Sequence, residues 1–164
     1  MLTREQALAD YEAGLKRFDR LIPPTSDTLT VVLKSHLLIE EQMQSIIEAA
    51  VHTPELVRTA RLTFYQRLKL AQAIAGHFSQ VVAWDAIESL NSIRNRLVHA
   101  PEPAPSDELL APFLAHCNRE TRLANARQAP EGLPRLRAYL AHIWVTVDVV
   151  HDVIRVVKEK MPLP

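Results

Sequence analysis

The chain has 164 residues, of which 48% are hydrophobic and 23% charged, and its formal net charge is +0. These totals are sufficient for one compact domain with a buried core over residues 1–164, and they argue against intrinsic disorder. The three glycines, Gly14, Gly76 and Gly132, do not lie in a glycine-rich loop, which excludes the Walker and Rossmann nucleotide motifs. Because the net charge is zero, any affinity for nucleic acid must come from a local patch.

Several features predict a cytoplasmic protein. The single cysteine, Cys117, cannot form an internal disulfide, which is typical of a reducing compartment. The N-terminal sequence "MLTREQALADYEAG" is charged from its fourth residue and lacks the apolar segment of a signal peptide. No apolar run approaches the ~20 residues that span a bilayer, so we expect no membrane partner.

Apolar residues recur at helical spacing in nearly every segment, and strand-like alternation is absent. The sequence therefore predicts an all-α fold, a single compact bundle of about five to six helices. Prolines separate several of these helices, and good N-capping residues begin two of them. In chain order, the predicted helices cover about 4–21, 26–51, 62–77 and 82–99, then a shorter helix after Ser106 and Asp107, and finally 133–160.

Three polar residues fall on helix faces that are otherwise apolar. His36 and Glu40 interrupt the stripe of the second predicted helix, and Arg94 interrupts that of the fourth. Because a buried charge is costly unless it is paired, we expect that Glu40 and Arg94 face each other, or that both line a wet cleft. A Glu40–Arg94 bridge would either fix helix register or position Arg94 for a ligand. His36 is interpreted first as a hydrogen-bonded core histidine.

The segment "SIRNRLVHAP" combines Arg94, Asn95 and His99 at the end of the fourth predicted helix. In a regular helix His99 lies well round the axis from Arg94, whereas Asn95 and His99 share a face. We expect the helix to unwind near Pro101, which would let His99 turn towards Arg94 or towards a partner subunit. The simpler interpretation is a histidine favoured by the dipole at a helix C-terminus.

The pattern Arg94-Asn95-x-x-x-His99 resembles the R-x4-6-H signature of HEPN domains, in which a polar residue follows the arginine. In that family the motif lies near the end of a long helix in a compact helical bundle, so the resemblance extends loosely to the whole all-helical layout. A second resemblance, to the mannitol operon repressor family, involves "FYQRLKLAQAI", the arginine and histidine of "RNRLVH", and "SDELLAPF" in the same order. That family looks HEPN-like in fold and is regarded as regulatory.

The HEPN resemblance implies a metal-independent endoribonuclease, or an RNA-binding protein, with a toxin, defence or stress role and no cofactor. RNA supplies its own nucleophile, the 2′-hydroxyl, so such a site needs only a proton-transfer group and a fixed positive charge. The resemblance implies these roles for His99 and Arg94, with Asn95 holding a phosphate oxygen or orienting His99, and Glu40 anchoring Arg94. Members usually form the site across a homodimer, and a protein antitoxin is a further expected partner.

Other candidate sites in the sequence have simpler explanations. Five arginines between Arg119 and Arg137 form a candidate basic patch, but a solvated surface is the simpler interpretation. Asp148, His151 and Asp152 share one side of the last predicted helix and are the best metal candidates, although an exposed helical face explains them better. Aromatic residues are only 5% of the chain, which argues against base stacking of the RRM or OB kind.

The main alternative to an RNA-directed enzyme is a non-catalytic helical module that acts in regulation or interaction. In that interpretation Arg94, Asn95 and His99 cap and brace the fourth predicted helix. The sequence does not separate the two functions, because both need the same polar residues to be ordered.

Overall fold

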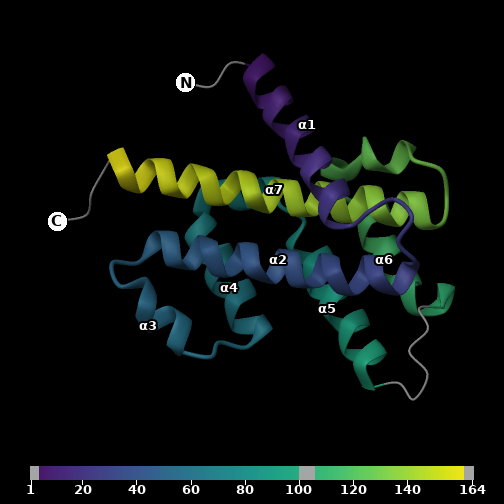
Figure 1. Ribbon diagram of the computed structural model, residues 1–164, viewed down its shortest axis with the longest axis horizontal. Coiled ribbons are helices and arrows are strands. Elements are labelled where there is room, and N and C mark those ends of the chain that lie inside the picture. The colour runs from purple at the N-terminus through teal and green to yellow at the C-terminus, as the bar shows by residue number, and fades with distance from the viewer. Residues whose placement is uncertain (1–3, 100–105, 161–164) are drawn as a thin grey trace.

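A computed structural model describes residues 4–99 and 106–160 of the chain (Figure 1). Over these residues the fold is all-α, as predicted, and contains seven α-helices, three short 3₁₀-helices and no strand. The α-helices are α1 (Arg4–Leu21), α2 (Thr28–Ala50), α3 (Pro54–Thr59), α4 (Phe64–Ala75), α5 (Trp84–His99), α6 (Asp107–Arg119) and α7 (Leu133–Lys160); the 3₁₀-helices are η1 (Gly76–Val81), η2 (Thr121–Leu123) and η3 (Ala126–Gln128).

The helix boundaries follow local chemistry. The Asp27 side chain caps α2 by accepting a 2.9 Å hydrogen bond from the Thr30 backbone N–H. Helix α4 begins with a capping box, in which Thr63 accepts from the Gln66 N–H while the Gln66 side chain accepts from the Thr63 N–H. These two caps fix where α2 and α4 start, and hence which of their residues face each other.

The prediction of five to six helices was one too few, because the sequence analysis missed α3. This helix has only six residues and none of them is buried, so it produces no apolar periodicity. Its local signal is Pro54 in the first helical turn, where the missing N–H of proline costs nothing.

Helices α2 and α7 run side by side in the same direction and form the long axis of the bundle (Figure 1). Contacts at three levels hold this register. Near the start of α7, Arg137 donates to the Ile22 carbonyl in the connection between α1 and α2. In the middle, Gln42 donates to Asp148 at 2.7 Å, and at the end Lys158 donates to the Val51 carbonyl. The pair is therefore tied along its length by polar contacts as well as by packing.

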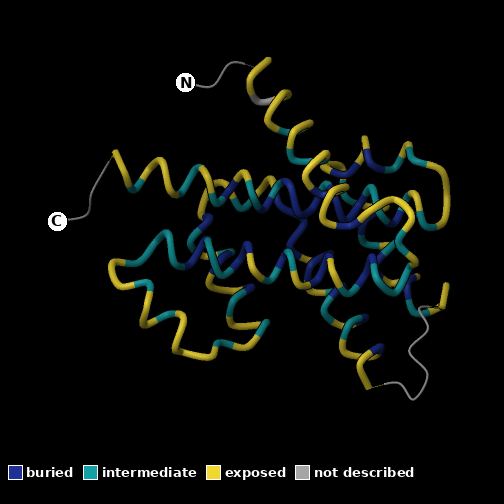
Figure 2. The backbone as a smooth tube through the Cα atoms, in the orientation of Figure 1, coloured by how far each residue is buried: buried dark blue, intermediate teal, exposed yellow. Residues whose placement is uncertain are grey.

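The core is continuous between α2, α7 and the helices that cover them (Figure 2). In α5 the predicted apolar face is buried as expected, with Ala83 just before the helix followed by Ile87, Leu90 and Leu97. The stripe predicted for α7 is buried from Leu136 to Val150, but Val157 is exposed.

Helices α4 and α5 pack on α2 and on each other, so polar residues of these three helices meet at one place. Within 4–99 and 106–160, no helix combines the length and apolar character needed to cross a membrane.

The hydrogen bonds of the Arg137 guanidinium are expected to stabilise the fold. The guanidinium donates to Asp19 Oδ1 and the Ile22 carbonyl, both at 2.7 Å, and to the Pro23 carbonyl at 3.0 Å, while the Arg137 side chain is only 11% exposed. A lysine ammonium lacks this planar fork, so Arg137→Lys should lower the free energy of unfolding by about 1–3 kcal/mol in urea titrations. The matched change Arg155→Lys, at an exposed site, should cost less than about 0.5 kcal/mol. Equal losses in the two variants would contradict this account of Arg137.

Candidate functional site

A polar hollow of about 400 Å³ opens where α2, α4 and α5 meet. It contains two of the three residues of the sequence motif, Arg94 and Asn95, together with His36 and Glu40, the polar residues that interrupt the apolar stripe of α2. Its other lining residues come from the start of α4 and from one turn earlier in α5. The full lining is His36, Glu40, Leu62, Thr63, Phe64, Tyr65, Arg67, Asn91, Arg94 and Asn95.

Glu40 pairs with Arg67, and not with Arg94 as one of the two expectations had it. Arg67 Nη1 of α4 lies 2.5 Å from Glu40 Oε1, and Arg67 Nε donates to Gln44 Oε1 at 2.9 Å. The predicted Glu40–Arg94 bridge is therefore absent from the described residues, because α4 packs on this face of α2 and presents its own guanidinium to the carboxylate. The other expectation fits the structure, since Glu40 and Arg94 both line the hollow.

Arg94 is half-buried and has no carboxylate partner among the described residues. Its Nη1 donates to Oδ1 of the adjacent Asn95 at 3.1 Å, which leaves most of its five donors unused. The bond also commits Asn95 Oδ1 and leaves the Asn95 NH₂ group as a donor. With two guanidinium groups and one carboxylate, the hollow has an uncompensated positive charge at Arg94.

His36 is buried at the base of the hollow and is held by two neighbours. Its Nε2 lies 3.1 Å from Asn91 Oδ1, and its ring stacks on Phe64 with centroids 4.6 Å apart. Its Nδ1 is buried without a hydrogen-bond partner in the described residues and lies 3.9 Å from Glu40 Oε2. Burial lowers the pKa of His36; the Asn91 hydrogen bond and Glu40 oppose this shift, and Arg94 adds to it. His36 is therefore held neutral near pH 7.

His99 is placed differently from the other motif residues. It is exposed in the last turn of α5 and does not line the hollow. Because α5 remains helical through His99, this side chain projects about 140° round the axis from Arg94. The expected unwinding thus does not occur at or before His99, and Pro101 lies outside the described residues. Within one chain, the imidazole and the guanidinium are not brought together.

Several residues of the hollow were missed in the sequence analysis. Arg67 lies within the segment "FYQRLKLAQAI", and its pairing with Glu40 depends on how α4 docks, for which the sequence carried no signal. Asn91 did carry a signal, since it precedes Arg94 by three residues and so shares its helix face. Tyr65 and Thr63 line the hollow because α4 begins beside α5, a long-range arrangement that the sequence pattern does not indicate.

Other candidate sites are weaker. No group of three or more His, Cys, Asp or Glu within the described parts of the chain is arranged to hold a metal ion, and Asp148 is already engaged by Gln42 and Arg17. Cys117 is buried, and burial raises the pKa of its thiol, so it is not a reactive nucleophile.

Four arginines of the candidate basic patch donate hydrogen bonds to other groups of the same chain. Backbone carbonyls accept hydrogen bonds from each of them, and three also meet a carboxylate. A patch whose guanidinium groups hold loops together has less to offer a phosphate chain. The four residues are Arg122, Arg127, Arg135 and Arg137.

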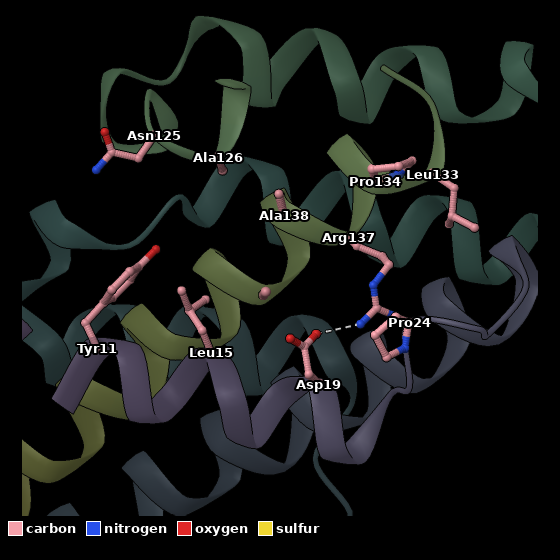
Figure 3. Close-up of a pocket in the computed structure, with 11 residues that line it drawn as sticks. Tyr11, Leu15, Asp19, Pro24, Asn125, Ala126, Leu133, Pro134, Arg137 and Ala138 are labelled. Carbon is pink, nitrogen blue, oxygen red and sulfur yellow. Dashed lines mark hydrogen bonds and ion pairs between the residues drawn. The ribbon is translucent and has the colours of Figure 1, made fainter. Parts of the chain in front are cut away.

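A larger hollow, of about 600 Å³, lies between α1, η3 and the start of α7 (Figure 3). Its walls are mostly apolar, and all of its polar side chains except Asn125 are engaged in contacts within the chain. Arg137 binds Asp19 on one side, and on the other the Tyr11 hydroxyl lies 2.6 Å from His142 Nδ1. This hollow offers no polar group comparable with Arg94.

In comparisons with known proteins, no protein-family model, curated protein or solved structure matches the chain.

The lowered pKa of His36 predicts a loss of stability in acid. The unfolded chain binds a proton at this histidine below pH about 6.5, while the folded protein still keeps it neutral. The contribution of neutral His36 to the free energy of unfolding is therefore fully present above that pH, and it is lost as the pH falls through the folded-state pKa. His142, whose pKa burial also lowers, contributes in the same direction.

Urea unfolding near neutral pH and near pH 5 measures this effect. His36→Gln should show a smaller loss of unfolding free energy between the two conditions than the wild type. The double variant His36→Gln/His142→Gln should show the smallest loss. An unchanged pH dependence in both variants would contradict the assignment.

Proposed function

We propose that this protein is a HEPN-like RNA-directed protein that acts as a homodimeric, metal-independent endoribonuclease. The observation that carries the proposal is Arg94, a half-buried guanidinium in an open hollow with no carboxylate to neutralise it. Asn95 is bonded directly to it, and the same helix ends at an exposed imidazole, His99. A toxin, defence or stress role in the cytoplasm, with a protein antitoxin as partner, belongs to the same proposal.

The proposed chemistry uses only side chains and the substrate. His99 accepts the proton of an RNA 2′-hydroxyl, whose oxygen attacks the adjacent phosphorus. The O2′–P bond forms and the P–O5′ bond breaks, giving a 2′,3′-cyclic phosphate and a 5′-oxygen anion that takes a proton from water to become the 5′-hydroxyl. Arg94 stabilises the additional negative charge on the phosphorane, and the Asn95 NH₂ group donates to a non-bridging oxygen.

The position of His99 supports the homodimer in this proposal. His99 projects about 140° away from Arg94 and lies outside the hollow, so in the proposed site a second chain brings its own imidazole to the guanidinium. The end of α5 suits such a contact, since Val98 is 52% exposed beside His99. Two-fold symmetry would then form two equivalent sites, each with Arg94 from one chain and His99 from the other.

One observation favours a second candidate, a non-catalytic module like that of the mannitol operon repressor family. His99 does not line the hollow, so a single chain provides a charged binding site without a proton-transfer group. In that case Arg94 matters for ligand binding and His99 does not.

Substitution of the motif residues tests the proposal. His99→Gln should abolish cleavage of single-stranded RNA while leaving RNA binding nearly intact, and Arg94→Ala should abolish cleavage and also weaken binding. We expect cleavage to persist in EDTA and to disappear with an all-2′-deoxy substrate, because the 2′-hydroxyl is the nucleophile. The measurements are gel-resolved cleavage and fluorescence anisotropy. Binding without cleavage by the wild type would favour the non-catalytic candidate, and no binding at all would contradict both RNA roles.

Mixed dimers provide the matched control for the shared site. Arg94→Ala and His99→Gln chains, each inactive alone, should regain about a quarter of the wild-type rate when mixed in equal amounts, because half the dimers are mixed and each holds one intact site of two. If the mixture stays inactive while subunits are shown to exchange, both groups act within one chain and the dimeric site is wrong.

A further inference from the structure

Tyr65 is an exposed aromatic side chain at the rim of the polar hollow. It is the second residue of α4, lines the hollow, and is 56% exposed. Lys69, one turn later, places its Nζ 5.1 Å from the ring centroid. The ring is therefore not part of the core, and it carries a cation near one face while it borders the cavity that contains Arg94.

The hollow also contains groups suited to the polar parts of a ligand. Arg94 provides the uncompensated charge, and Asn95 has a free NH₂ group beside it. At the base, the buried Nδ1 of His36 has no hydrogen-bond partner among the described residues. The volume of about 400 Å³ falls within the range of about 300–1,000 Å³ typical of small-ligand sites.

A nucleotide matches these features better than a peptide or a free anion. A base has a flat π-face that stacks on a tyrosine, and its phosphate requires a cation at the same site. An aromatic ring contributes nothing to a free phosphate, and an uncompensated arginine contributes nothing to an apolar side chain. Because a paired base is already stacked in a duplex, the nucleotide must be unpaired.

We propose that the hollow between α2, α4 and α5 binds one unpaired nucleotide of an RNA strand, with its base stacked on Tyr65 and its phosphate bound by Arg94. This inference rests on the proposed RNA-directed function and adds to it the position of a nucleotide that flanks the cleaved bond. A single ring of this kind holds one base, so it differs from the multi-base platforms of RRM and OB domains. Tyr65 is here a positioning residue for the RNA strand.

The test uses single-stranded, fully 2′-O-methylated RNA of about twelve nucleotides, enough to fill a typical single-strand site, with 2-aminopurine at one position in each of a series of oligonucleotides. The 2′-O-methyl group prevents cleavage, and stacking on a tyrosine quenches 2-aminopurine fluorescence. We expect quenching at one or two positions with the wild type, and Tyr65→Phe should keep the affinity because it keeps the aromatic face. Tyr65→Ala should lose the quenching and bind at least about fivefold more weakly, the lower limit for one stacked base.

Phe78→Ala is the matched control, because Phe78 is an aromatic residue of similar exposure, 46%, that does not line the hollow. It should bind and quench like the wild type, and thermal unfolding should show that all variants are folded. A free 2-aminopurine ribonucleotide monophosphate is tested in parallel. If it binds as tightly as the oligonucleotide, the site belongs to a mononucleotide and the RNA-strand assignment is overturned.

The outcomes separate this inference from the proposed function. If Tyr65→Ala binds and quenches as the wild type does, while Arg94→Ala loses binding, the nucleotide site is wrong and the RNA-directed function stands. If the wild type binds no RNA, both are overturned. Loss of quenching and of affinity in Tyr65→Ala supports the site if Tyr65→Phe keeps the affinity and Phe78→Ala keeps both.

Discussion

The ion pair between Arg67 of α4 and Glu40 of α2 determines the charge of the hollow. The 2.5 Å contact neutralises the one carboxylate that lines the cavity, and Gln44 holds the same guanidinium from the side. Both partners are only partly exposed, with side-chain exposures of 22% and 27%, so solvent screens the pair less than it would at the surface. Arg94 consequently lines a hollow whose one carboxylate is already paired, and its own positive charge has no carboxylate partner among the described residues.

This arrangement divides the polar residues of the bundle into two groups. His36, Asn91, Glu40 and Arg67 bond one another and hold α2, α4 and α5 together. Arg94, Asn95 and Tyr65 also line the hollow and, apart from the Arg94–Asn95 bond and the Lys69 contact of Tyr65, have donors or ring faces that are not used internally. His99 belongs to neither group, because it projects from the last turn of α5. The first group therefore joins the three helices, and the second group has polar atoms and a ring face without a partner among the described residues.

Much of the fold was predictable from local rules, and much of the site was not. The helical spacing of apolar residues correctly predicted α1, α7 and the buried face of α5. A helix buried on one side needs apolar residues about every 3.6 positions, so its sequence shows that period. Helix α3 was missed because it buries nothing. The odd positions of His36, Glu40 and Arg94 identified the polar hollow, but the partner of Glu40 was left open between a bridge and a cleft. That choice depends on α4, a separate helix whose docking is a long-range property of the whole core.

The most direct test of this account compares the RNA affinity of the wild type, the single variant Arg67→Gln and the double variant Arg67→Gln/Glu40→Gln. Arg67→Gln releases the Glu40 carboxylate beside Arg94, so we expect it to weaken binding of single-stranded RNA by about tenfold or more, equivalent to at least about 1.4 kcal/mol. Adding Glu40→Gln removes that carboxylate and should return the affinity close to the wild-type value, with unfolding curves confirming that both variants are folded. If Arg67→Gln/Glu40→Gln binds as weakly as Arg67→Gln alone, or if Arg67→Gln has no effect, the ion pair does not keep Arg94 free and the central claim is wrong.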